Sequence, residues 1–147
     1  MISTSIFAAS SSDAEAIGNA EEESRDAWES LDVDGLEQVR LATLLCIVCD
    51  EDWDDDVLDE FESLHAVSPQ GPWIFLIPSR MTRGLAYMKD ARAETVAKEW
   101  ASTEELQRDA NLDSSIEVFA EDCLAELRRL ATIAGEDELE LLLKISL

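Results

Sequence analysis

The clearest pattern in this sequence is an alternation of side chains over residues 139–147. The odd positions are leucine or isoleucine throughout, whereas the even positions are Glu140, Leu142, Lys144 and Ser146. Because successive side chains of a strand point to opposite faces, this alternation predicts a strand whose odd face packs on helices. Residues 2–9 alternate in a similar way, and residues 73–78 are apolar on both faces, which is typical of an interior strand.

Between these strands, apolar residues recur every three to four positions, which is the period of a helix. This period predicts helices over residues 13–31, 36–49, 57–65, 79–88, from 90 to about 100, a short turn near 102–105, and 114–135. The second of these is apolar on nearly every side, so we expect it to be the central helix. The sequence therefore predicts an α+β fold in a single domain, residues 1–147. About six helices pack on a small sheet with strands near 2–9, 73–78 and 139–147.

Several residues are of the types that begin or end helices. Ser12 with Glu15, and Ser114 with Glu117, have the spacing of a capping box. Other residues stand where we expect helix caps, at Asp34, Ser79 and Asp90, and Gly135 stands where we expect the last helix to end.

The charge of the chain narrows the range of partners. The 34 acidic and 11 basic residues give a formal net charge of -23, and residues 1–70 hold 19 of the acids but only two of the bases. Such a field repels phosphate groups, so we expect no direct binding to nucleic acid or to anionic membranes. No apolar run is long enough to span a bilayer and no signal peptide is evident, so we expect a cytoplasmic protein. The alternative explanation is that the acidity serves solubility or adaptation to salt.

An acidic run follows the second predicted helix, at Asp50, Asp52, Asp54, Asp55 and Asp56. A calcium-binding EF-hand loop needs glycine at its sixth position and glutamate at its twelfth. Neither frame of the run meets this requirement, so we expect an exposed acidic segment without tight calcium binding. This segment is also the candidate surface for a basic partner.

The cysteines raise the question of a metal site. Cys46 and Cys49 form a C-x-x-C pair, and with Cys123 and His65 they would complete a Cys3His set, which is an established zinc coordination type. The set lacks a second paired motif. Buried cysteines that act as small apolar residues are much commoner, so the interpretation that we favour includes no metal and no cofactor.

Arg80 and Arg83 lie at the start of a predicted helix, where positive charge opposes the helix dipole. They can bind an anion or form salt bridges with acids of the chain itself, and we favour the salt bridges. A small-ligand cleft lined by Trp73, Arg80, Arg83 and His65 is the alternative. No nucleophile motif or phosphate loop is present, so we assign no catalytic residue.

Several segments together resemble the YfbM-like family of bacterial domains of unknown function. They are the opening strand, the turn at residues 31–34 with the apolar helix after it, the strand at 72–78 with its following helix, and the closing helix and strand. Val39 to Cys46 stand where the family would have a tryptophan and a histidine. The resemblance implies a compact α+β domain with no transferable catalytic residues.

Composition and resemblance lead to two hypotheses about function. The first is a non-enzymatic interaction domain, such as a regulator, inhibitor or immunity-type protein, that binds a basic protein through its acidic first half. The second is a small-ligand-binding protein or an undescribed enzyme. The sequence does not determine the oligomeric state.

Overall fold

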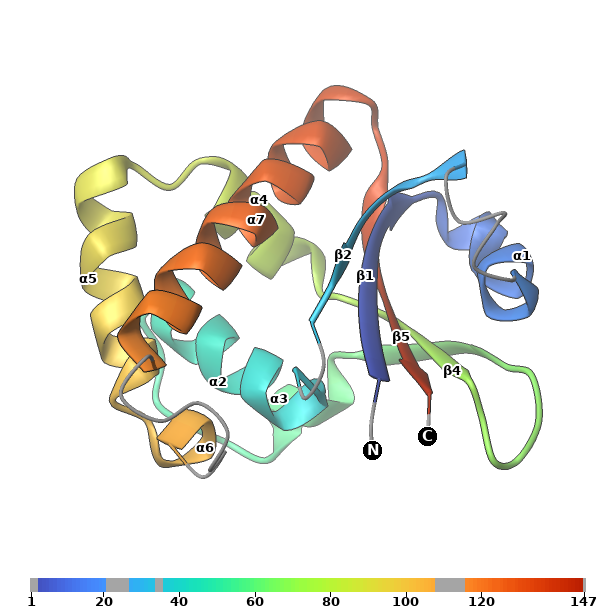
Figure 1. Cartoon of the computed structure of the whole chain (residues 1–147), viewed down its shortest axis with the longest axis horizontal. Coiled ribbons are helices and arrows are strands. Elements are labelled where there is room, and N and C mark those ends of the chain that lie inside the picture. The colour runs from blue at the N-terminus through green and yellow to red at the C-terminus, as the bar shows by residue number, and fades with distance from the viewer. Residues whose placement is uncertain (1–2, 21–26, 34–35, 108–115, 147) are drawn as a thin grey trace.

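The computed structural model describes residues 3–20, 27–33, 36–107 and 116–146. Within these residues, five antiparallel strands form one sheet in the order β2-β1-β5-β4-β3 (Figure 1). The strands are β1 (Ser3–Ala9), β2 (Glu29–Asp32), β3 (Glu62–Ala66), β4 (Trp73–Leu76) and β5 (Glu140–Ser146). The three strands predicted from the sequence are therefore the three inner ones, and β2 and β3 are the edges.

Strand β5 lies at the centre of the sheet because both of its faces are apolar. Leu141 and Leu143 belong to a large core shared with the helices, as the odd-face pattern predicts. Leu142 points the other way, into a smaller core that also contains Phe7, Ile17 and Ile74. The prediction of a helix-covered odd face is confirmed, and the even face is covered as well.

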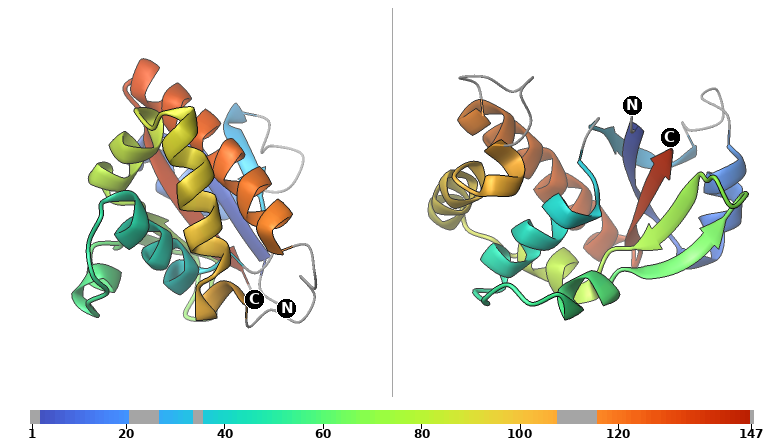
Figure 2. Two further views of the ribbon diagram at one scale, coloured as in Figure 1. Left: turned by 90° about the vertical axis from the view of Figure 1, so that its left-hand side faces the viewer. Right: turned by 90° about the horizontal axis from the view of Figure 1, so that it is seen from below.

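The helices cover the two faces of the sheet unequally (Figures 1 and 2). On one side of the sheet lie α2 (Gln38–Val48), α3 (Asp56–Asp59), α4 (Ser79–Ala86), α5 (Asp90–Ala101), α6 (Glu104–Gln107) and α7 (Ile116–Glu136). The other face carries the 3-10 turn at Ser11–Asp13 and the short helix α1 (Ala14–Asn19). The α+β class, with most of the helical mass on one side of a small sheet, is confirmed.

Helix α2 is buried among the other helices, as its apolar sequence predicts. Residues 41–46 are all buried. The indole of Trp100, on α5, is fully buried, and its Nε1 donates to the carbonyl oxygen of Arg40 at 3.2 Å. This bond ties α5 to α2 inside the apolar layer.

Two of the helix predictions are partly wrong, because part of each predicted segment forms a strand of the sheet. The helix expected over residues 13–31 ends at Asn19, and residues 29–32 pair with β1 as strand β2. The helix expected over residues 57–65 is the single turn α3, followed by strand β3, which pairs with β4. Edge strands gain their hydrogen bonds from a partner far away in sequence, which a local pattern does not reveal.

The helix ends also differ from the expected caps. Glu37 caps α2, because its carboxylate accepts the N–H groups of Val39 and Arg40. Ser79 and Asp90 are the first residues of their helices and do not act as caps. Helix α7 continues through Gly135, and Glu138 adopts the left-handed conformation beyond its end. The expected caps Asp34 and Ser114 lie outside the described residues.

Within the described ranges, none of the helices combines the length and apolar character needed to cross a bilayer.

Candidate functional site

Residues 50–56 join α2 to α3 and are here called the acidic loop. All of its side chains are exposed, including that of Trp53, which is 45% exposed. Ion pairs within the described part of the chain involve Glu51 but none of the loop's five aspartates. The five aspartates predicted as a partner surface therefore present their carboxylates to solvent around an exposed indole.

The backbone of the acidic loop is fixed at both ends. Asp50 has a φ of 55°, and the N–H of Glu51 donates to the carbonyl oxygen of Cys46 at 2.8 Å. This is the Schellman arrangement that ends a helix with a left-handed residue. At the other end, the carboxylate of Asp54 accepts the N–H of Asp56, and Trp53 Nε1 donates to Asp55.

Arg80 anchors the acidic loop to α4. Its guanidinium group binds Glu51 and both carboxylate oxygens of Glu60, with Nε lying 2.8 Å from Glu60 Oε1. The hydrogen bonds that Arg80 donates to Glu60 and Glu51 raise the pKa of its guanidinium group, and the one donated to Glu51 lowers the pKa of that carboxyl group. Arg80 therefore serves as a structural clamp between the acidic loop, the end of α3 and α4. Internal salt bridges were favoured for both Arg80 and Arg83; Arg80 forms them, whereas Arg83 takes part in no ion pair within the described residues.

The cysteines are buried or half-buried thiols. Cys46 and Cys49 end α2, and Cys123 lies on α7. Burial raises the pKa of each thiol, that of Cys123 to about 12. Within the described residues, no three His, Cys, Asp or Glu side chains come together as metal ligands. The structure does not assemble the Cys3His set, because His65 lies on β3 and faces α1.

Within the described part of the chain, the four residues expected to line a ligand cleft lie in different surroundings. His65 pairs with Ile74, a member of the smaller core, and a Cβ placed on Gly18 of α1 would lie 3.1 Å from its ring. Trp73 directly precedes Ile74 on β4, so its side chain points to the opposite face of the sheet. Arg80 is held by two glutamates. Arg83, one turn further along α4, is exposed and lines a different hollow.

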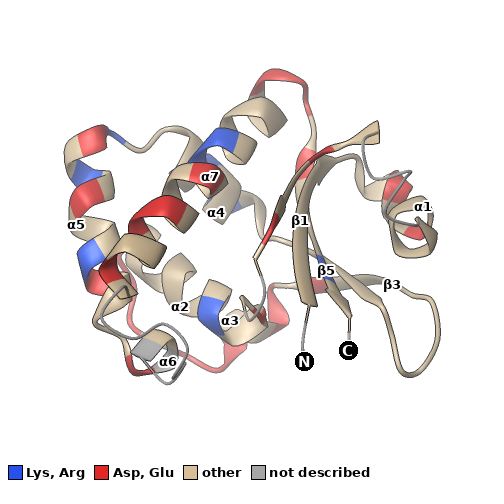
Figure 3. Cartoon of the chain, in the orientation of Figure 1, with Lys and Arg blue, Asp and Glu red and all other residues tan. Residues whose placement is uncertain are grey.

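The charges are spread over most of the surface. Figure 3 shows acidic residues along α5 and α7, with basic residues interspersed among them, and further acidic residues on the strands. Two of those basic residues, Arg128 and Arg129, lie on α7. Arg129 binds Glu126 and Glu29, and Arg128 binds Asp90. Many of the scarce cations are thus already paired with carboxylates of the chain.

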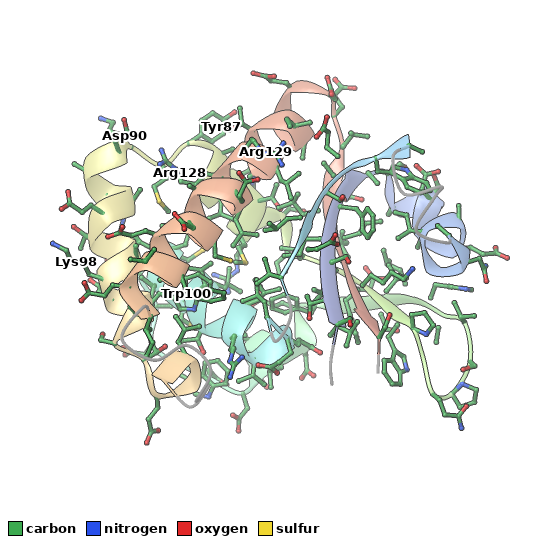
Figure 4. The ribbon with its side chains drawn as sticks, in the orientation of Figure 1. Tyr87, Asp90, Lys98, Trp100, Arg128 and Arg129 are labelled. Carbon is green, nitrogen blue, oxygen red and sulfur yellow. The ribbon has the colours of Figure 1, made fainter. Side chains whose placement is uncertain are left out.

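A groove of about 370 Å³ separates α5 from α7. Its lining includes alanines and Leu124, with the carboxylate-bearing residues Glu94 on α5 and Glu121 on α7. Arg128 also lines it, and its Nη2 donates to the carbonyl oxygen of Met88 at 2.8 Å and to Asp90 at 3.1 Å. In Figure 4 Arg128 extends from α7 toward the start of α5, where Asp90 lies. The sequence analysis missed this groove, because the only signal for it is the small residues of α5.

No protein-family model, curated protein or solved structure matches this chain. The resemblance to the YfbM-like family therefore stays a prediction from the sequence.

Proposed function

We propose that this chain is a non-enzymatic interaction domain that binds a basic protein through the acidic loop. A regulator, an inhibitor or an immunity-type protein would each work in this way, in the cytoplasm of a bacterial cell. The observation that carries the proposal is a set of five exposed aspartates on a fixed backbone around Trp53, none of them in an ion pair with the residues that the structure describes.

The charges support fast and selective association. A net charge of -23 attracts a basic protein over a distance of about one Debye length, roughly 8–10 Å in physiological salt. The same field repels phosphate groups of nucleic acids and lipids. Because Arg80 already binds Glu51 and Glu60, it does not neutralise the aspartates of the acidic loop.

Trp53 adds an apolar contact to this surface. Tryptophan is enriched among the residues that contribute most to protein interfaces, and its indole can stack on an arginine side chain. The groove between α5 and α7 adds a second acidic feature, since its alanines suit the aliphatic part of a lysine and its glutamates suit the ammonium group. We assign the primary contact to the acidic loop, because its five aspartates take part in no ion pair within the described part of the chain.

The test compares two variants that have the same net charge. The loop variant replaces Asp50, Asp52, Asp54, Asp55 and Asp56 by asparagine, which tolerates the left-handed conformation at position 50 and keeps a capping oxygen at position 54. The control variant neutralises five other exposed acids, namely Glu15, Glu99, Glu117, Glu136 and Asp137. Each immobilised protein is used to retain proteins from a cell extract at low and high salt.

We expect a basic protein that the wild type and the control variant retain at low salt, and that the loop variant does not retain. We also expect its affinity for the wild type to fall steeply as the salt concentration rises. Equal retention by the loop variant, or retention that does not depend on salt, would contradict the proposal. So would the absence of any protein that distinguishes the two variants.

A further inference from the structure

A small cavity of about 130 Å³ lies beside the first half of α4, where α7 ends and β5 begins. It is separate from the acidic loop, which lies against α2 and α3. Its walls combine two apolar side chains, two hydroxyls and two opposite charges, and its lining residues are Ile77, Ser79, Thr82, Arg83, Gly135, Leu139 and Glu140.

The two charged residues are the unusual feature of this cavity. Arg83 and Glu140 line the same small space, yet they form no ion pair with each other or with any other residue in the described part of the chain. One turn earlier on the same helix, Arg80 binds two glutamates. In a chain with three acids for each base, an arginine without a carboxylate partner is left available for a ligand.

We propose that this cavity binds a small zwitterionic α-amino acid. Arg83 would hold the carboxylate group and Glu140 the ammonium group, because each matches the opposite charge at one end of the ligand. The side chain of the ligand would lie against Ile77 and Leu139, which form the apolar part of the wall.

The start of α4 favours the same orientation. Met81 and Thr82 donate their N–H groups to the carbonyl oxygen of Pro78, so the first hydrogen bonds of α4 form there. The N–H groups that precede them, together with the helix dipole, favour negative charge at this end. The Ser79 hydroxyl also lines the cavity on this side and can donate to a carboxylate oxygen.

Size and charge limit the ligand to this class. A cavity of about 130 Å³ lies below the roughly 300–1,000 Å³ of pockets for drug-sized ligands, which favours a ligand as small as glycine, alanine or serine. A free anion would be repelled by the net charge of -23, whereas a zwitterion carries no net charge. The protein should therefore prefer an amino acid to a simple carboxylate.

The test titrates the full chain with four probes, namely glycine, L-alanine, acetate and methylamine, and follows binding by nuclear magnetic resonance. We expect saturable shifts with glycine or alanine at a Kd of about 1 mM or tighter, and binding at least about tenfold weaker for acetate and for methylamine. Acetate that binds as tightly as glycine would overturn the proposal in favour of an anion site. No saturation by either amino acid would overturn it altogether.

Matched variants locate the ligand. We expect Arg83→Gln to weaken glycine binding at least about tenfold, with Lys89→Gln as the control for the same change of charge. We expect Glu140→Gln to weaken glycine binding but not acetate binding, with Glu136→Gln as its control. Gly135→Leu should block the cavity while the chain stays folded, because a Cβ at this position meets no atom within 4 Å. Unchanged glycine binding by Arg83→Gln and Gly135→Leu would place the ligand elsewhere and overturn the assignment.

Discussion

Gly84 of α4 faces Val48 at the end of α2 so closely that a Cβ on residue 84 would lie 2.6 Å from Val48 Cγ1. A contact of this length forces one of the two groups to move. Because valine is stiff at χ1, its methyl group does not move away easily. The close approach of the two helices therefore depends on glycine at position 84.

The first prediction follows from this contact. Gly84→Ala gains up to about 1 kcal/mol of helix propensity but forces an extra carbon into a packed contact, at a cost of about 1–3 kcal/mol. We expect the variant to be less stable than the wild type by about 1 kcal/mol in urea unfolding. In a Val48→Ala background the clash is absent, so the same substitution should become stabilising. A destabilisation that persists in that background would mean that another contact excludes the side chain.

The second prediction concerns the left-handed residue Asp50. A non-glycine residue in this conformation costs roughly 1 kcal/mol relative to glycine, and a carboxylate at the C-terminal end of a helix is also unfavourable. We expect Asp50→Gly to raise the free energy of unfolding by about 0.5–1 kcal/mol. Asp52→Gly serves as the control, since Asp52 is not among the positive-φ residues, and should not be stabilising. Similar effects of the two substitutions would contradict the Schellman assignment.

The third prediction concerns the clamp formed by Arg80. Removing its guanidinium group with Arg80→Ala should lower stability at neutral pH by about 1 kcal/mol, the upper range for partly exposed ion pairs. Arg80→Lys should recover part of the loss, because lysine keeps the charge but not the planar fork.

The same clamp predicts a dependence on pH. The folded-state pKa of Glu51 is depressed from its ordinary value of 4.5, so its contribution is present above pH 4.5 and is lost as the pH falls through the lower, folded pKa. The stability difference between wild type and Arg80→Ala should therefore shrink below pH 4.5. A difference that stays constant down to pH 2 would show that the arginine acts through packing alone.

The fourth prediction uses the buried thiol of Cys123. Its pKa is raised from 9.0 to about 12 by burial, so the folded state disfavours the thiolate. The unfolded chain loses this proton near pH 9, and folding stability should fall as the pH rises from about 9 to 12. Cys123→Ala should show a shallower fall over this window, measured by urea unfolding at several pH values. An identical slope for both proteins would contradict the raised pKa of Cys123.

A second experiment tests the same burial. The folded wild type should resist alkylation of Cys123 at neutral pH and should react after unfolding.

The periodic segments of the sequence determined most of the framework. Strand β5 was predicted from the alternation over residues 139–147, and α2 and α7 from their 3.6-residue periods, because burial demands one apolar face or more in each. The apolar run at Trp73–Leu76 likewise identified an interior strand. The exposure of the aspartates at 50–56 was also expected, since carboxylates are seldom buried without a partner.

The tertiary structure decided what depends on distant partners. Glu29–Asp32 and Glu62–Ala66 are strands because β1 and β4 offer them hydrogen bonds, although their own sequences permit a helix. The partners of Arg80 lie 20 and 29 residues away in the sequence. Arg83 and Glu140 line one cavity but do not pair with each other. Hydrophobic periodicity reports which side of an element is buried. Which charged groups meet is set by the packing of elements that are far apart in the chain.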